Sequence, residues 1–235
     1  MLIVKFCSRS HNPLLSETKI QLCTVYYYKS TDNDFIRDVD EGLISRTFHP
    51  PTPVVFTGND IGRMTGLSIS GTGTIRVAGR AVKTTGPIPN AYVFCTSRLD
   101  EPTPEHAASF GYDSWYVIKD ASLLCDAMAQ EVRRQVAPES DILAFHGEVS
   151  YQEEKAVVYS ALSDFFRSHR VIGRCIYLLK RQTAQQNDLR LYAKEHEYRF
   201  VFLPVGKGGR PMPLTKERIY LESSCILDII AKGAV

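Results

Sequence analysis

The chain has 235 residues, of which 44% are hydrophobic and 23% are charged, and its formal net charge is +2. This composition is typical of a globular protein with one substantial core, and it excludes a disordered or low-complexity chain. A net charge this small is not by itself the footprint of a nucleic-acid-binding protein, so any basic surface must be local.

Cysteine spacing and apolar runs indicate the class of protein. The six cysteines are far apart, without C-x-x-C or zinc-like Cys/His spacing, so we expect no metal site. Several lie in apolar runs, where a free thiol fits a reducing compartment. The N-terminus lacks a signal-peptide pattern and no apolar run reaches roughly 20 residues, so we expect a cytoplasmic protein without a membrane partner.

A short arm or edge strand is expected over residues 1–19, and a single domain is expected over residues 20–235. Residues 20–29 are rich in β-forming side chains, including three consecutive tyrosines, and predict a strand. Thr31 and Asp34 resemble a capping box, which predicts a short helix that ends at Gly42.

The stretch from residue 54 to residue 98 is expected to be largely strand and turn. Residues 54–56 predict a short strand, and the glycine-rich residues 66–83 predict hairpin-like turns. A phosphate loop is disfavoured there, because the G-x-x-x-x-G-K-[ST] pattern is missing. Residues 90–98 predict a clear strand that ends in the hydroxyls of Thr96 and Ser97.

Two helix signals follow that strand. Pro104 is expected to begin a short helix that Gly111 ends, and Asp120 is expected to cap a longer helix that runs through residue 136. Phe110 and Tyr112 flank the glycine. They either form an aromatic lip that stacks on a flat ring such as a base, or they make ordinary packing contacts.

The next segment contains a histidine and the most basic stretch of the chain. Residues 142–151 predict a strand on which His146 and Glu148 share a face, either as a dyad or with the histidine in a structural role. Residues 153–181 predict two helices. Their basic residues either form solvated surface or guide an anionic partner towards the strand that follows.

Residues 194–203 form the stretch with the most chemical content. With a two-residue period, Tyr198 and Phe200 fall on a core face, whereas Glu195, Glu197 and Arg199 fall on the other. Two carboxylates that point the same way beside an arginine can divide the work of acid–base or electrostatic catalysis. The alternative is the solvated face of an ordinary strand.

The run Glu-x-Glu-Tyr-Arg leading into an aromatic strand resembles the catalytic-glutamate strand of ADP-ribosyltransferase-fold proteins, in particular uncharacterised bacterial members tied to phage defence and toxin systems. The strand and helix after residue 20, the Cys-Thr-Ser strand end and the C-terminal residues are similar too. The resemblance implies an α+β fold with a mixed β-sheet core and flanking helices.

The resemblance also implies roles for individual residues. Glu197 is the expected catalytic glutamate, and Glu195 is expected to orient or deprotonate the acceptor. Tyr28, or its neighbour Tyr26, is expected to hold NAD. One hydroxyl, from Thr96 or Ser97, is expected to brace the nicotinamide ribose pocket, and Tyr112 is a further candidate contact to NAD.

The implied activity is mono-ADP-ribosylation, in which ADP-ribose passes from NAD to a macromolecular acceptor, either a nucleic acid such as RNA or a protein. Such an activity in a cell implies a toxin and a restraining antitoxin partner. Two alternatives remain open at this point: a non-catalytic binding module of the same fold that holds nucleic acid or protein, and an NAD glycohydrolase that uses water as the acceptor.

Overall fold

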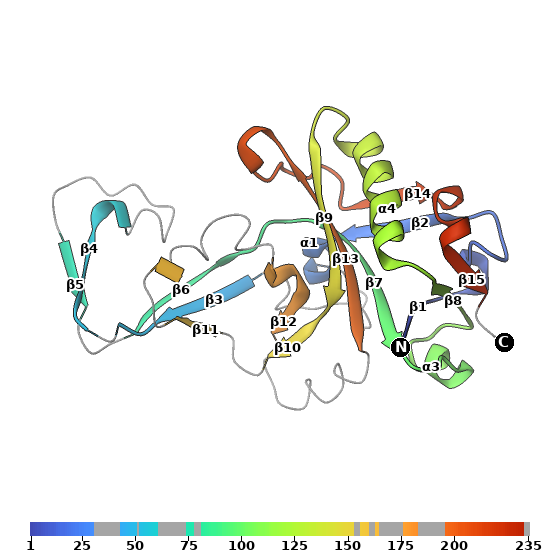
Figure 1. The fold of residues 1–235 in the computed structure, drawn as a ribbon, viewed down its shortest axis with the longest axis horizontal. Helices are drawn as coiled ribbons and strands as arrows, with labels where there is room; N and C mark the ends of the chain where they lie inside the picture. The colour runs from blue at the N-terminus through green and yellow to red at the C-terminus, as the bar shows by residue number, and fades with distance from the viewer. Residues whose placement is uncertain are drawn as a thin grey trace.

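The fold is α+β, with a mostly antiparallel sheet and few helices, as seen in the computed structural model of the chain (Figure 1). The structure describes residues 1–30, 43–50, 52–60, 74–77, 81–152, 156–159, 163–164, 176–182 and 196–232. The helix expected to end at Gly42 lies outside the described residues. Among the described residues, no helix is long and apolar enough to cross a membrane.

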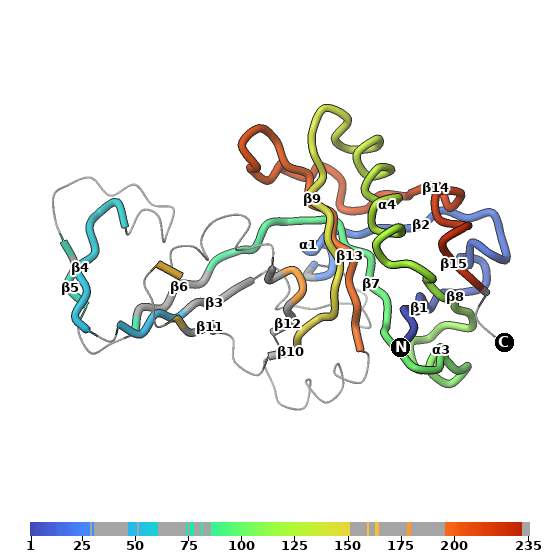
Figure 2. Tube along the Cα trace, viewed as in Figure 1, coloured from blue at the N-terminus to red at the C-terminus, as the bar shows by residue number. Residues whose placement is uncertain are grey.

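One large sheet organises the molecule. Its strands are β1 Leu2–Cys7, β2 Lys19–Thr24, β7 Tyr92–Leu99, β8 Ser114–Ile118, β9 Asp141–Glu148, β13 Glu197–Val205, β14 Arg218–Glu222 and β15 Ile230–Lys232. The strand order is β14-β2-β7-β1-β8-β15, and β13 and β9 extend from β7 (Figures 1 and 2). All described pairings in this sheet are antiparallel, so the mixed core that we expected is mostly antiparallel.

Strand β7 is the centre of this sheet. One of its edges pairs with β13, and its other edge pairs first with β2 and then with β1. Between those two partners the amine of Lys5 donates a hydrogen bond of 2.9 Å to the carbonyl oxygen of Cys95 and lies 4.9 Å from the centre of the Phe94 ring. A lysine therefore satisfies a backbone acceptor where β7 changes partner.

The prediction of an arm or edge strand over residues 1–19 is wrong. β1 lies inside the sheet, because it pairs with β7 on one side and with β8 on the other. Its side chains alternate between two clusters, so that Val4 and Phe6 pack with Trp115 while Cys7 packs in the main core. Burial on both faces is what an internal strand requires.

The helices cover parts of the sheet. Among the described residues these are α1 Val25–Ser30, α3 Pro104–Ser109 and α4 Ala121–Val136, with 3-10 turns η1 Arg9–His11, η2 Ile176–Leu179, η4 Lys207–Gly209, η5 Ser223–Cys225 and η6 Leu227–Ile229, and residues 58–60 and 163–164 are also helical. The two capped helices confirm the sequence prediction. Thr103 accepts from the backbone of His106, and Asp120 accepts from the amide of Leu123 at 2.9 Å.

Helix α4 closes the main core. Its buried side chains, which include Leu124, Met128 and Val132, pack in one cluster with Phe200 and Phe202 of β13. These helix residues follow the 3.6-residue period, so one face of the helix carries the apolar contacts. The face of β13 that was expected to be core is core.

Three small sheets complete the described structure. They are formed by β3 Leu43–Phe48 with β6 Val82–Pro87 and β11 Ala156–Tyr159, by β4 Val54–Thr57 with β5 Thr74–Val77, and by β10 Ser150–Gln152 with β12 Lys180–Gln182. Where the glycine-rich stretch is described, its two strands do not pair with each other, because β5 pairs with β4 and β6 pairs with β3. Two helices were expected over 153–181, and where that stretch is described the expectation is wrong at β11, η2 and β12 but agrees with residues 163–164, which are helical.

The buried thiols predict how stability depends on pH. Burial raises the pKa of Cys7 and that of Cys125 from 9.0 to about 11. The unfolded chain therefore loses these protons at lower pH than the folded chain does. We expect the free energy of unfolding contributed by these thiols to be fully present below pH 9 and to be lost as pH rises towards 11.

Urea unfolding curves at pH 8 and at pH 10.5 measure this effect. The Cys125→Ala variant is the control, because it lacks one of the two thiols and should show a smaller fall in midpoint between the two pH values. A midpoint that is the same at both pH values would contradict the prediction.

Candidate functional site

Glu197 is the first residue of β13, and the fold buries it. Only 7% of its surface is exposed, although a strand that begins with charged residues usually presents them to water. Opposite it in the antiparallel ladder with β7 lies Ser97. Residues that face each other across a ladder share a face of the sheet, so the Ser97 hydroxyl and the Glu197 carboxylate belong to the same face.

Arg199 holds the Glu197 carboxylate. Its Nε lies 2.6 Å from Oε1 of Glu197, and only 4% of the arginine surface is exposed. Another of its nitrogens, Nη1, donates to the carbonyl oxygen of Leu178 at 3.2 Å. A buried charge is tolerated when it is paired and hydrogen-bonded, and this pair meets both conditions. The interpretation of this face as solvated strand surface is therefore wrong.

The 3-10 turn η2 covers the face that carries the ion pair. Leu178 is fully buried, and the adjacent Leu179 packs over β9 at Gly147. Gly147 faces Arg199 in the ladder, and a Cβ atom at this glycine would lie 3.0 Å from Leu179 Cδ1. The missing side chain thus makes room for the turn above the ion pair.

The backbone around Glu197 is fixed on both sides. The amide of Val149 donates to the Glu197 carbonyl oxygen at 2.9 Å, and the amide of Arg98 donates to the His196 carbonyl oxygen at 2.8 Å. His196 has a φ of 43°. This left-handed conformation is unfavourable for a residue other than glycine and often occurs at functional sites.

The two hydroxyls left open by the sequence lie on opposite faces. Ser97 shares the face of Glu197, as its position in the ladder requires. Thr96 faces the other way and donates from Oγ1 to the carbonyl oxygen of Tyr198 at 2.8 Å. Of the two, only Ser97 is placed to brace a ligand against Glu197, whereas Thr96 ties β7 to β13.

The strand expected over residues 20–29 is wrong in its second half. β2 ends at Thr24, and the three tyrosines lie in helix α1. The Thr24 hydroxyl accepts from the amide of Tyr27 at 3.1 Å, which is how a threonine caps the start of a helix. Tyr28 and Tyr26 therefore do not extend a strand into the site.

Tyr28 nevertheless packs against the sheet face that carries Arg199, in one apolar cluster with Cys95 and Leu178. Burial raises the pKa of its hydroxyl well above the usual value, the neighbouring thiols of Cys95 and Cys23 raise it further, and Arg199 opposes the shift. Tyr28 is therefore a neutral phenol near Arg199, and its hydroxyl is hydrogen-bonded with the thiols of Cys23 and Cys95.

The other candidate aromatic residues point elsewhere. The hydroxyl of Tyr26 donates to the carbonyl oxygen of Ile88 at 3.0 Å. Tyr112 is 38% exposed, and its amide donates to the carbonyl oxygen of Ala107 at the end of α3. Phe110 stacks on Phe6 with ring centres 5.3 Å apart, so this half of the expected lip is packing.

The possible dyad of His146 and Glu148 is on the face of the sheet opposite Glu197. Glu148 lies across from Tyr198 in the ladder and pairs with Arg98, while the His146 ring contacts Tyr198. The two side chains share a face, as predicted, but each has a different partner.

Two of the sequence predictions fall where the structure gives no description. Glu195 lies outside the described residues, and so do most of the basic residues between 153 and 190. Within the described ranges, no group of three His, Cys, Asp or Glu side chains is arranged to hold a metal ion.

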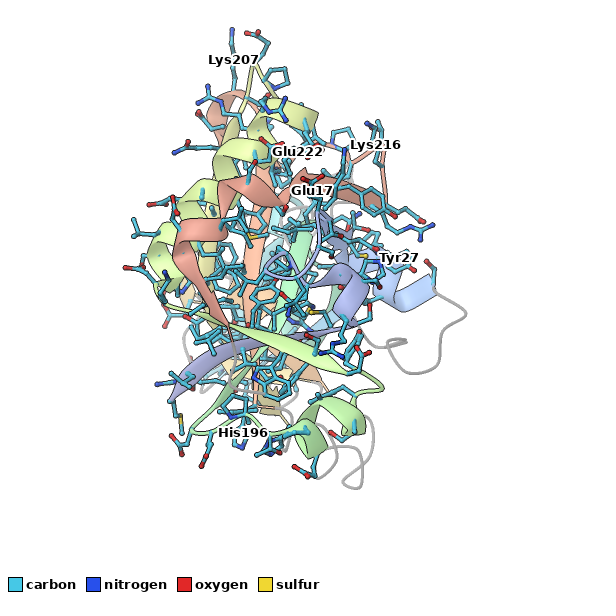
Figure 3. All side chains as sticks on the ribbon, turned by 90° about the vertical axis from the view of Figure 1, so that its right-hand side faces the viewer. Glu17, Tyr27, His196, Lys207, Lys216 and Glu222 are labelled. Carbon is cyan, nitrogen blue, oxygen red and sulfur yellow. The ribbon has the colours of Figure 1, made fainter. Side chains whose placement is uncertain are left out.

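A surface hollow of about 380 Å³ lies at the other end of β9 and β13. Its lining includes Glu139, Asp141 and the glycine turn around Lys207. Figure 3 shows Lys207 and His196 at opposite ends of the molecule. We favour the Glu197 end as the functional site, since the hollow is an open turn without a buried charge, whereas Glu197 and Arg199 form a buried ion pair.

The sequence placed Glu197 and Ser97 among the candidate residues, and the structure brings these two together, but the sequence did not reveal three features of their surroundings. It did not predict the burial of Arg199, the carbonyl ligand from Leu178 or the backbone conformation of His196. The first two depend on η2, which precedes β13 by about 20 residues and gives no periodic signal of its own.

No protein-family model, no curated protein and no solved structure matches this chain.

Proposed function

We propose that the protein is a mono-ADP-ribosyltransferase that transfers ADP-ribose from NAD to a macromolecule, and that it acts as a bacterial toxin restrained by an antitoxin. One observation carries the catalytic part of the proposal. It is the Glu197 carboxylate, buried at the start of β13, paired with Arg199 at 2.6 Å and in register with Ser97. The toxin and antitoxin rest on the resemblance of the Glu-x-Glu-Tyr-Arg strand.

The chemistry suits a fixed carboxylate. NAD supplies an ADP-ribosyl group whose bond to nicotinamide breaks, and positive charge develops on the ribose as it does. A carboxylate held in place before the reaction stabilises charge that exists only near the transition state. Arg199 fixes the direction of the Glu197 carboxylate, and Ser97 offers a hydroxyl to the ribose on the same face.

Hydroxyl groups near Glu197 support the proposal that a ribose binds there. Ser97 and Tyr28 supply hydroxyls, and both belong to the face that carries Glu197. The left-handed His196 fixes the entry of the chain into β13. Strain of this kind persists when the surrounding structure holds it, which supports a preorganised site.

Incubation of the protein with biotinylated NAD, in separate reactions with RNA, DNA and a protein lysate, tests the proposal. Label on a macromolecule supports transfer and identifies the acceptor class. Free ADP-ribose without label transfer would make the protein an NAD glycohydrolase. Intact NAD in every reaction would contradict the proposal and favour a binding module.

Glu195→Gln tests the role of the second glutamate, a role that rests on the sequence alone. If Glu195 activates the acceptor, the variant should lose transfer to the macromolecule much more than NAD hydrolysis, because water reaches the ribose cation without a positioned base. Nicotinamide release and label transfer are measured in parallel on the same preparation. Equal loss of both would place Glu195 on the NAD side of the reaction.

A further inference from the structure

A second group of polar side chains lies on the face of the sheet opposite Glu197. His146 in β9 is engaged at both ring nitrogens. Its Nδ1 lies 2.5 Å from the Tyr198 hydroxyl, and its Nε2 lies 3.4 Å from Oγ of Ser122. The three side chains therefore form one chain from an exposed serine, through an imidazole, to a partly buried phenol.

The fold holds this chain in place from two sides. Ser122 is the second residue of α4, and α4 packs along β9 and β13. The His146 ring lies against the rings of Tyr198 and Phe200, with centres 5.8 and 5.5 Å apart. An imidazole packed between aromatic rings keeps its orientation, so its Nε2 stays directed at the start of α4.

The Tyr198 hydroxyl contacts Nδ1 of His146 and can bind either tautomer of the imidazole, because a phenol both donates and accepts. Burial raises the pKa of the Tyr198 hydroxyl, although the nearby Arg98 opposes the shift, so the side chain is a neutral phenol. In the tautomer whose proton is on Nδ1, the phenol oxygen accepts that proton's hydrogen bond. The Nε2 atom is then an acceptor that faces the Ser122 hydroxyl.

We propose that Ser122, His146 and Tyr198 form a second catalytic site, which hydrolyses small carboxylic esters. Ser122 is the nucleophile, His146 is its general base, and Tyr198 is a positioning residue that acts through the histidine. A nucleophile next to a base that a third group orients is the recurring arrangement of covalent hydrolases. The distance of 3.4 Å between Oγ and Nε2 is in the range that such pairs show before substrate binds.

The reaction has two balanced steps. In the first, Oγ of Ser122 bonds to the ester carbonyl carbon, its proton moves to Nε2 of His146, and the alcohol leaves with that proton. In the second, water attacks the acyl-serine, the same Nε2 takes and returns a proton, and the carboxylic acid leaves. One ester and one water give one acid and one alcohol.

The start of α4 supplies donors for the oxyanion of the tetrahedral intermediate. The first amides of a helix have no acceptor within the helix. Asp120 takes the amide of Leu123, but those of Ala121 and Ser122 precede it in the same turn as the nucleophile. Backbone amides aimed at a developing oxyanion are a large source of rate enhancement in acyl transfer.

A fluorophosphonate probe tests the nucleophile directly. The probe forms a bond from phosphorus to Oγ and releases fluoride, and peptide mass spectrometry locates the adduct. We expect one adduct, on Ser122, and none on Ser122→Ala. Ser224→Ala is the matched control, because Ser224 is another exposed serine in a short turn, and its removal should leave the labelling unchanged.

The base is tested by the rate of labelling. His146→Ala should slow labelling about 10²–10⁴-fold, the usual contribution of a general base, and added imidazole should restore part of the rate. His146→Gln serves in its place if the alanine variant unfolds. Absence of an adduct on Ser122 of the wild-type protein, or labelling unchanged in both histidine variants, would overturn the proposal.

Tyr198→Phe separates positioning from packing. With p-nitrophenyl acetate as substrate, the variant should lower kcat and leave KM unchanged, because the phenol orients the imidazole and does not touch the ester. An unchanged kcat would remove Tyr198 from the mechanism. These assays contain no NAD, so their failure is distinguishable from failure of the proposed ADP-ribosyl transfer.

Discussion

Glu197→Gln should lower the rate of nicotinamide release from NAD about 10²–10³-fold, the loss that follows removal of one electrostatic group acting in a transition state. The amide keeps an oxygen that can accept the hydrogen bond from Nε of Arg199, so the local geometry is expected to survive. What the variant loses is the negative charge next to the ribose. Single-turnover measurements with saturating NAD report this step directly.

Glu148→Gln is the matched control for this experiment. Glu148 is also a strand glutamate paired with an arginine, Arg98, but it is exposed and lies on the opposite face of the sheet. Its removal should leave nicotinamide release unchanged. If Glu197→Gln is as active as Glu148→Gln, then Glu197 has no part in the reaction, and the proposed function loses its main support.

The elements that the sequence predicted well are those with strong local signals. α3 and α4 carry side-chain caps at Thr103 and Asp120, and β7 is a run of β-forming residues. Each signal lies within a few residues of the structure that it specifies. Local propensity and the final fold agree at these places, as they do in most of a foldable sequence.

The tyrosine run shows where local propensity fails. Three tyrosines after β2 favour a strand, but the Thr24 hydroxyl caps a helix over the same residues. The buried face of that helix, with Val25 fully enclosed, then packs against the sheet. The threonine cap and the tertiary contact together outweighed the β preference of the tyrosines.

The sequence predicted which residues of the candidate site share a strand face, but it did not predict which other residues cover that face. The two-residue period placed Glu197 and Arg199 on one face, which the structure confirms. The sequence did not reveal that Leu178 and Leu179 cover this face, because the contact joins residues about 20 positions apart. For that reason the alternation of charged and aromatic residues left a solvated face open as an alternative, although both faces of β13 are buried.

Arg199→Met should lower the free energy of unfolding by about 3–5 kcal/mol, because it leaves the carboxylate of Glu197 buried without the arginine. For a chain of this size that loss corresponds to a fall in Tm of about 6–20 °C. Methionine has a similar length and no charge, so the change removes the ion pair and keeps most of the packing. Thermal unfolding followed by circular dichroism measures the effect.

Arg98→Met provides the control for the arginine, since the ion pair of Arg98 with Glu148 has exposed side chains, 39% and 57% respectively. Exposed pairs contribute about 0–1 kcal/mol, so this variant should unfold close to the wild-type temperature. The double variant Glu197→Gln/Arg199→Met should recover part of the loss seen in Arg199→Met, because no buried charge then remains at either position. If Arg199→Met is as mild as Arg98→Met, the ion pair is not what holds Glu197 in place, and the preorganised carboxylate on which the proposed chemistry depends must be fixed by other contacts.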